Sequence, residues 1–483
     1  MFVRTDRFAD EDSIEYADGV QTDVNILSIN DNDVDIRTDN LALRARYERD
    51  MFGGETRIKL GYAAFDDEPE EFENEAEYLR DGVPFPEEDR YTAELEFRDL
   101  QDEEMSFAIE HSRPVGDDVE LEFGVQAVSK DRDSTTVVAD RVRFNIPNAP
   151  TPRPAQPPFV FNTSSYVIEE TRIDPYVMVS GESGALKWEA GLRYETTDTT
   201  IAGVDNDFAV LLPSASLRYR LSDSDRLTLS VARTVRRPDF DDLAPVTLEE
   251  ERGDNDFRGN PLLEPETAWG VDLGFERRLG RRGVIGVNAF YRDVTDLIED
   301  VNTGLEGSGG PGTFIESIDN VGDGQVYGVE FDLSTPLDFI GMETTGVFLN
   351  ASWLDSQVED VMGERRFNSQ SDYVVNFGFT HDIPSWGAAF GASYRKQGDA
   401  FERVYAEEVV TSYGADLEIF FEKRIFSNTV IRLTGSNLLD SSKDEVFDKF
   451  DDQADQIARD YDEYELETES AGPVYQLVMR VAF

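Results

Sequence analysis

The side chains of this chain that could do chemistry are mostly carboxylates. Aspartate and glutamate together number 101, against 45 lysines and arginines, which gives a formal net charge of −56. Cysteine is absent, and the only two histidines, His111 and His381, lie far apart in the sequence. A disulfide framework, a thiol nucleophile and a histidine-rich metal site are therefore excluded. Carboxylate pairs occur throughout the chain, so no single pair identifies a two-acid hydrolase.

One charged segment stands where a predicted strand passes into a long loop. The segment is "VRRPDFDDL", residues 235–243, and it contains Arg236, Arg237 and Asp239. These three residues are the candidate ligand contacts, although ion pairing at the same position would explain them equally well. No catalytic residue, metal ligand or cofactor is predicted.

A second charged segment covers residues 440–470 and is strongly acidic. It could capture a cation or a basic ligand, or it could be a hydrated external loop, since runs of like charge are mostly solvated. The acidic excess of the whole chain argues against a nucleic-acid-binding protein, because phosphate recognition needs a basic surface. The 32 phenylalanines and 18 tyrosines argue against a disordered acidic protein.

The elements that position these residues are predicted from a period-two pattern. In residues 269–276, for example, Trp269, Val271, Leu273 and Phe275 alternate with glycine, aspartate and glutamate. Alternation of this kind indicates β-strands with one apolar face. The alternating segments run for about ten residues or more, which is the length of a tilted strand that crosses a bilayer in a barrel. No apolar run approaches the roughly 18 residues of a membrane-spanning helix.

Seventeen strands are predicted. They cover residues 41–49, 55–65, 91–113, 118–129, 166–181, 186–198, 210–221, 226–236, 266–279, 283–297, 324–335, 344–357, 371–381, 387–397, 411–423, 428–438 and 472–483. Short and long connections alternate if 91–113 is kept as one strand. The long ones include 66–90, 130–165 and 199–209. Outer-membrane barrels have short periplasmic turns and long external loops.

The predicted fold is therefore all-β, a large antiparallel transmembrane β-barrel with about 17–18 strands present. An additional strand within 20–36 would make the number even, as in bacterial barrels. The polar face of each strand turns inward and carries charges such as Arg193, Arg218, Asp272 and Glu330.

Several segments resemble TonB-dependent outer-membrane receptors, in the same order along the chain. They are "LLPSASLRYRLSDSDRLTLSVARTVRRPDFDDLAP" (211–245), "GNPLLEPETAWGVDLGFERRL" (259–279), "VNAFYRDVTDLI" (287–298), "VYGVEFDLSTPL" (326–337), "QSDYVVNFGFTHD" (370–382) and "LTGSNLLD" (433–440). The final strand resembles the closing strand of that family. Its Tyr475 and terminal Phe483 are, by this resemblance, the signal read by the barrel assembly machinery.

The resemblance implies a transporter of the Gram-negative cell outer membrane and not an enzyme. Such receptors bind a scarce nutrient, commonly a ferric siderophore, a corrinoid or a saccharide. The TonB complex then acts on a plug inside the barrel. Lipid and lipopolysaccharide would surround the barrel. Two alternatives remain open, a plugless passive pore and a surface β-rich adhesin.

The expected domain organisation departs from the family in one respect. Residues 1–40 are expected to form a partial strand and loop region, and 41–483 the receptor barrel. Barrels of this kind have about 22 strands and a plugged lumen. No plug domain, TonB box or signal peptide is recognised, so the chain is expected to be the C-terminal part of a longer receptor.

Overall fold

The structure is a computed structural model that describes residues 2–16, 22, 25–78, 90–144, 155–248, 255–307 and 313–481. Nearly all of these residues lie in two β-sheets, one of 21 strands and one of four. Three strands of the larger sheet are only two or three residues long, namely β10 (Thr247–Leu248), β11 (Asp256–Arg258) and β16 (Gly363–Arg365). The other eighteen principal strands in the described part of the chain build the wall of the molecule.

The principal strands follow one another in chain order. They are β1 (Phe2–Tyr16), β2 (Ile26–Met51), β3 (Gly54–Glu77), β4 (Arg90–Pro114), β5 (Val119–Phe144), β6 (Val160–Ser183), β7 (Leu186–Ile201), β8 (Val204–Arg220), β9 (Asp225–Arg236), β12 (Glu266–Leu279), β13 (Gly283–Glu306), β14 (Phe314–Leu337), β15 (Met342–Asp360), β17 (Tyr373–Ile383), β18 (Ala388–Gln397), β21 (Asp416–Phe426), β22 (Thr429–Ser436) and β25 (Val474–Val481).

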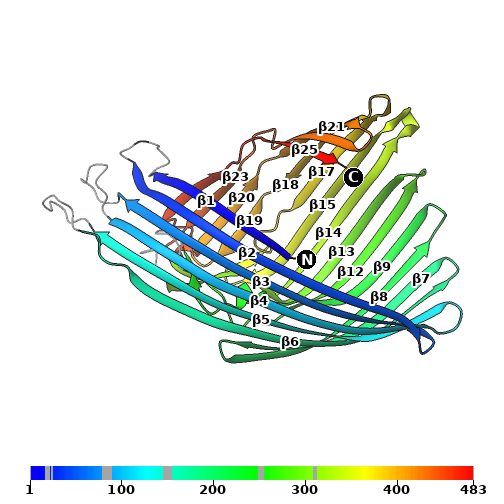
Figure 1. Ribbon diagram of the computed structural model, residues 1–483, viewed down its shortest axis with the longest axis horizontal. Helices are drawn as coiled ribbons and strands as arrows, with labels where there is room; N and C mark the ends of the chain where they lie inside the picture. Colours follow the sequence, from blue (N-terminus) through cyan, green and yellow to red (C-terminus); the bar gives the residue numbers. More distant parts are fainter. Residues whose placement is uncertain are drawn as a thin grey trace.

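Each principal strand pairs antiparallel with the one before and the one after it. The sheet curls strongly, so that the N-terminal strands face the C-terminal ones across a concave interior (Figure 1). Within the described residues, β1 pairs only with β2 and β25 pairs only with β22. The curled sheet thus has two free edges in the part of the chain that the structure describes.

All seventeen predicted strands are present, and β4 is a single strand of 25 residues. At about 3.3 Å per residue it is far longer than a bilayer is thick, so it projects beyond the membrane-spanning zone. The eighteenth strand was predicted in the wrong place. It is β1, and residues 26–36 belong instead to the next strand, β2. The two pair along their length, with Phe2 opposite Leu41.

Three predicted long loops are also shorter than expected. Strands β3, β5 and β6 extend into 66–90 and 130–165. Apolar residues do not alternate regularly there, because a strand outside the apolar band has no face that must be hydrophobic. The loop at 199–209 is a two-residue hairpin turn, in which Ala202 and Gly203 have φ of 48° and 83°. Positive φ at both positions gives a turn that matches the strand twist.

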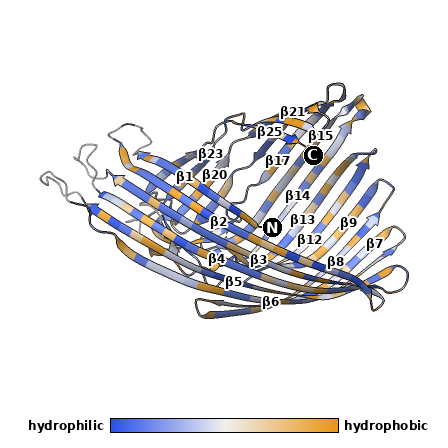
Figure 2. Ribbon diagram, in the orientation of Figure 1, coloured by the Kyte–Doolittle hydropathy of each residue, from blue (hydrophilic) through white to orange (hydrophobic). Residues whose placement is uncertain are grey.

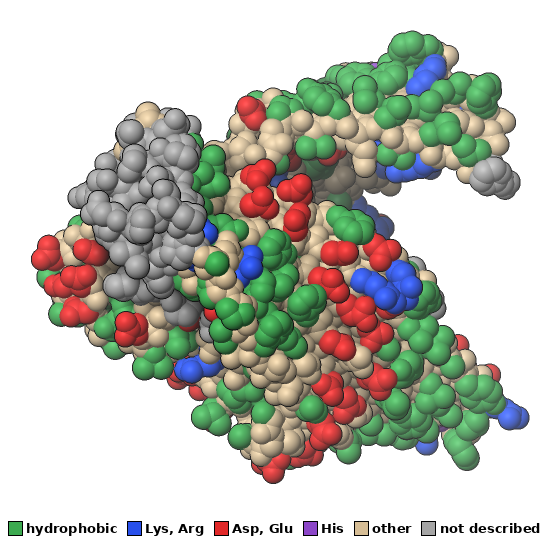
Figure 3. All heavy atoms as spheres, turned by 60° about the vertical axis from the view of Figure 1, so that its left-hand side comes forward, with side chains coloured by type: hydrophobic (Ala, Val, Ile, Leu, Met, Phe, Trp, Pro, Cys, Tyr) green, Lys and Arg blue, Asp and Glu red, His purple; other side chains and the backbone are tan. Residues whose placement is uncertain are grey.

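The two faces of the sheet differ in composition, as the period-two pattern predicts. Figure 2 shows hydrophobic and hydrophilic residues alternating along the strands. The outer face carries exposed apolar side chains in register, such as Leu229 opposite Leu273. Figure 3 shows apolar side chains over the outer surface and charged ones around the opening between the two arms of the sheet.

An aromatic belt marks one border of the apolar outer band. Trp269, Tyr291, Tyr327 and Trp353 lie exposed on consecutive strands β12 to β15. Tyr291 is directly opposite Tyr327, and the rings of Tyr327 and Trp353 are 6.1 Å apart. Girdles of aromatic residues at the two membrane surfaces are typical of transmembrane barrels.

The second sheet forms at the end opposite the short turns. Its strands are β19 (Ala400–Val404), β20 (Glu407–Tyr413), β23 (Lys443–Lys449) and β24 (Glu463–Glu469), and α2 (Gln453–Ala458) packs beside them. The acidic segment 440–470 is therefore largely folded. The buried Gln456 side chain accepts a hydrogen bond from the Ala406 amide and donates to the carbonyls of Val404 and Glu407.

The other helices are α1 (Phe240–Leu243) and the short 3₁₀ turns η2 (Asp338–Ile340) and η3 (Pro384–Trp386). None of the helices in the described ranges has the length and apolar character needed to cross a membrane.

The two faces can be tested with neighbouring residues of β12. Leu273 is 52% exposed on the outer face, whereas Asp272 faces inward and pairs with Arg292 at 2.8 Å. We expect Leu273→Arg to destabilise the barrel by about 2–4 kcal/mol in a bilayer. Asp272→Asn should cost under about 1 kcal/mol, because the ion pair is partly exposed. Urea unfolding in vesicles measures both, and equal effects would contradict the assignment of faces.

Candidate functional site

Residues 237–246, which include α1, fold inward from the wall into the concave interior. Its Leu243 is buried in a cluster with Tyr166, Ile168, Ile201 and Ile298 from β6, β7 and β13. Phe240, Ala244 and Val246 pack against the same cluster. Apolar burial thus fixes this segment, here called the inward segment, against the inner face of the sheet.

A second segment crosses the inward segment and locks it in place. The backbone N–H of Asn260 donates a hydrogen bond of 2.7 Å to the backbone carbonyl of Asp242, and Leu263 belongs to the same buried cluster. A Cβ atom added at Gly259 would lie 2.6 Å from the Ala244 carbonyl oxygen, so only glycine allows this close approach. The motifs "RRPDFDDLAP" and "GNPLLEP" are therefore two halves of one packed unit.

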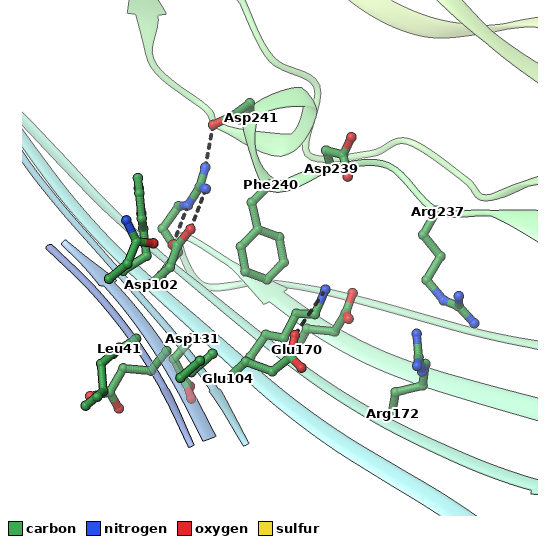
Figure 4. Close-up of a pocket in the computed structure, with 18 of the residues that line it drawn as sticks. Leu41, Asp102, Glu104, Asp131, Glu170, Arg172, Arg237, Asp239, Phe240 and Asp241 are labelled. Carbon is green, nitrogen blue, oxygen red and sulfur yellow. Dashed lines mark hydrogen bonds and ion pairs between the residues drawn. The ribbon is translucent and has the colours of Figure 1, made fainter. Parts of the chain in front are cut away.

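An ion-pair network ties the inward segment to the far wall. Arg132 on β5 donates two hydrogen bonds of 2.7 Å to Asp102 on β4 and one of 2.5 Å to Asp241 in α1. The Arg132 side chain is 9% exposed, and its guanidinium lies 5.4 Å from the centre of the Phe240 ring. Figure 4 shows Asp241 and Phe240 over the strands, with Asp102 beneath.

These contacts enclose a cavity of about 820 Å³ between the inward segment and strands β1 to β6. Four cations line it, namely Lys130, Arg132, Arg172 and Arg237. Each has an acidic neighbour: Glu104 at 4.0 Å from Lys130, Asp102 and Asp241 beside Arg132, Asp174 at 2.9 Å from Arg172, and Glu195 beside Arg237. Together with the Phe240 ring, this lining suits a polar ligand that carries both charged groups and an apolar surface.

Two of the three predicted contact residues line this cavity. Arg237 lies 6.0 Å from the Phe208 ring and pairs with Glu195, while Asp239 is exposed at the start of α1. Arg236 points elsewhere, toward Glu266 at 3.6 Å and the Ile298 carbonyl. A ligand role for all three stays a prediction.

The prediction from sequence missed the opposite wall of the cavity. Asp102, Lys130, Arg132 and Glu170 lie on β4, β5 and β6, and part of that stretch was predicted to be loop. The available signal was "SKDRD", residues 129–133, in which the basic residues Lys130 and Arg132 both fall on the inner face.

The sequence itself matches a known family. Residues 4–438 match the family model described as TonB dependent receptor-like, beta-barrel. The chain belongs to the TonB-dependent receptor family. The match is to the barrel domain of these outer-membrane transporters, and no plug domain is evident among the residues that the structure describes. A search of curated proteins gave no match.

Solved structures of TonB-dependent receptors share the fold of this barrel. The copper transporter OprC has a TM-score of 0.57 and 12% identity, covering 100% of this chain and 76% of its own. The FrpB iron transporter of Neisseria meningitidis, F3-3 variant, has a TM-score of 0.54 and 10% identity, covering 99% and 76%. The predicted all-β transmembrane barrel is thereby confirmed as the fold class.

The second sheet of this receptor barrel partly buries several carboxylates near Lys449. Burial raises the pKa of Glu407 to about 7; Lys449 opposes the rise, whereas Glu316, Glu402 and Glu465 add to it. Burial likewise raises the pKa of Glu402 and of Glu316 on β14. Within the described ranges, no group of three or more His, Cys, Asp or Glu residues is placed to hold a metal ion.

The Arg132 network makes a first prediction for this site. Arg132→Gln removes the guanidinium that links to the inward segment, so we expect amide hydrogen exchange in residues 240–244 to become roughly tenfold faster, as for a loss of about 1.4 kcal/mol. Asp241→Asn removes the charge but keeps an oxygen that can accept from Arg132, so its effect should be smaller. Asp102→Asn, which leaves the Asp241 contact in place, should change this exchange less. Unchanged exchange in Arg132→Gln would contradict the role of the network.

A second prediction concerns pH. The pKa of Glu407 is raised from 4.5 to about 7, so the folded second sheet binds this proton more tightly than the unfolded chain does. Its free energy of unfolding therefore falls as pH rises from about 4.5 to about 7, and it stays at the lower value above that range. Protection factors for amide exchange in β19 and β20, which correct for the faster intrinsic exchange at high pH, should be larger at a pH of about 5 than at about 8. Glu407→Gln should reduce this difference, and a pH dependence as large as in the wild type would contradict the assignment.

Proposed function

We propose that this chain forms the transport barrel of an outer-membrane receptor that takes up a scarce nutrient, such as a ferric siderophore, a corrinoid or a saccharide. Membership of the TonB-dependent receptor family supports a transport role. The single structural observation that carries the proposal is the cavity beneath the inward segment. It lies on the concave face, away from lipid, and its charged groups and aromatic ring could hold a polar solute.

In this proposal the short turns face the periplasm and the second sheet faces the outside. Lipid covers the outer apolar band, and lipopolysaccharide surrounds the acidic external end. The TonB complex acts on a plug domain inside the barrel, and Arg236, Arg237 and Asp239 lie near the path of the ligand.

Uptake by cells tests this function. The gene is deleted, and growth is measured with one ferric siderophore, one corrinoid or one saccharide as the sole source of iron, cobalamin or carbon. We expect growth to fail on one source and to be restored by the gene only when TonB is present. Uptake that continues without TonB would indicate the passive pore, and unimpaired growth with lost surface attachment would indicate the adhesin.

The end of the chain is proposed as the assembly signal. Tyr475 is 71% exposed on the outer face of β25, while Phe483 lies outside the described residues. Deleting Phe483 should reduce the amount of barrel in the outer membrane of cells several-fold, yet leave the urea midpoint of barrel refolded in detergent unchanged. An equal loss in both measurements would point to a purely structural role.

A further inference from the structure

One part of the inner wall has more basic than acidic side chains, although the chain as a whole is acidic. Lys187 on β7, Arg218 and Arg220 on β8, Arg226 on β9 and Arg278 on β12 line a cavity of about 460 Å³ at the end with the short turns. These five residues are here called the basic patch. Three acidic residues share the cavity, namely Glu182, Asp223 and Asp225.

The basic patch faces the concave interior. On β8, Leu217 and Tyr219 are exposed on the outer apolar face, so Arg218 and Arg220, which alternate with them, turn inward. The turns at 184–185 and 221–224 border the cavity, which places it at the mouth of the barrel and not beside the external loops.

The arrangement of the patch has an energetic cost. Lys187 is directly opposite Arg218, and Arg220 is directly opposite Arg226. Like charges at directly opposed positions destabilise a sheet. Two of the four cations find acidic neighbours, since Lys187 pairs with Glu182 and Arg226 lies 3.1 Å from Glu276.

The other cations of the patch are less compensated. Arg218, Arg220 and Arg278 are exposed, and none has a carboxylate within ion-pair distance in the ranges that the structure describes. Two of the three acidic residues have other partners, because Glu182 pairs with Lys187, and Asp225 accepts a hydrogen bond from Ser222 and lies 3.4 Å from Arg277. The local excess of positive charge is therefore available to an anionic partner.

We propose that the basic patch binds a carboxylate-rich polypeptide segment that enters the barrel through the mouth with the short turns. The patch crosses four neighbouring strands, which span about 14 Å at about 4.8 Å per strand. Side chains on one side of an extended segment are about 7 Å apart, so two or three glutamates or aspartates can reach across it. A lipid headgroup would have to leave the bilayer to reach this inward face. The location of the partner in the periplasm rests on the proposed function.

A binding experiment tests the patch directly. The 483-residue chain is refolded in a zwitterionic detergent and titrated with a fluorescent peptide of alternating glutamate and serine, at low ionic strength. We expect saturable binding that weakens with salt, because the contacts are exposed charges. A matched peptide with glutamine in place of glutamate should not bind.

The double variant Arg218→Gln/Arg220→Gln should bind the acidic peptide roughly tenfold more weakly. The control is Arg281→Gln/Arg282→Gln, which removes the same charge from the neighbouring turn outside the cavity and should bind like the wild type. Heat-modifiable gel mobility confirms that both variants fold.

Three outcomes would overturn the inference: equal weakening in both double variants, equal binding of the glutamine peptide, or Arg218-dependent binding of phosphatidylglycerol vesicles in preference to the peptide. The last would assign the patch to a phosphate headgroup. Because the titration requires no transport, a receptor that fails the growth test can still pass this one, and the two proposals fail separately.

Discussion

The structure depends on one constraint, the unbroken backbone pairing from β1 to β25. Each strand fixes the register of the next, so the period-two alternation of side chains continues across the whole wall. Leu229 therefore meets Leu273 on the outside, while Asp272 meets Ser230 on the inside. A slip of one residue in any strand would turn Asp272 and its equivalents toward lipid. The inward segment, the cavity and the basic patch all depend on this register.

Sequence alone predicted the wall well, because alternation is a local signal that neighbouring residues carry together. Strand β4 could be kept whole because Leu95 and Phe97 share the parity of Met105 and Phe107. The signal fails in the outer parts of β3 and β5, because polar residues predominate there and apolar residues do not alternate regularly with them. It also fails at Ala202, because its positive φ is set by the hairpin and not by its side chain.

The candidate site was less predictable, because its residues come from distant parts of the chain. Arg237 and Asp239 were found through their charge and their place at a strand end. Arg132 lies 109 residues before its partner Asp241, and nothing in the sequence links the two. The two family motifs at 211–245 and 259–279 were recognised as patterns, and the structure supplies the reason for them, since Gly259 and Asn260 pack across α1.

The barrel end away from the short turns is built differently on its two sides. Strands β2 to β6 reach it as 24 to 26 residues of continuous backbone ladder. On the other side, the second sheet joins the wall largely through side chains, with Arg403 3.0 Å from Asp360 and Ser369 donating to Glu402 at 2.6 Å. A paired ladder resists bending, whereas side-chain contacts in water exchange readily. This end of the barrel therefore has unequal stiffness around its circumference, and it deforms with least work on the side of the second sheet.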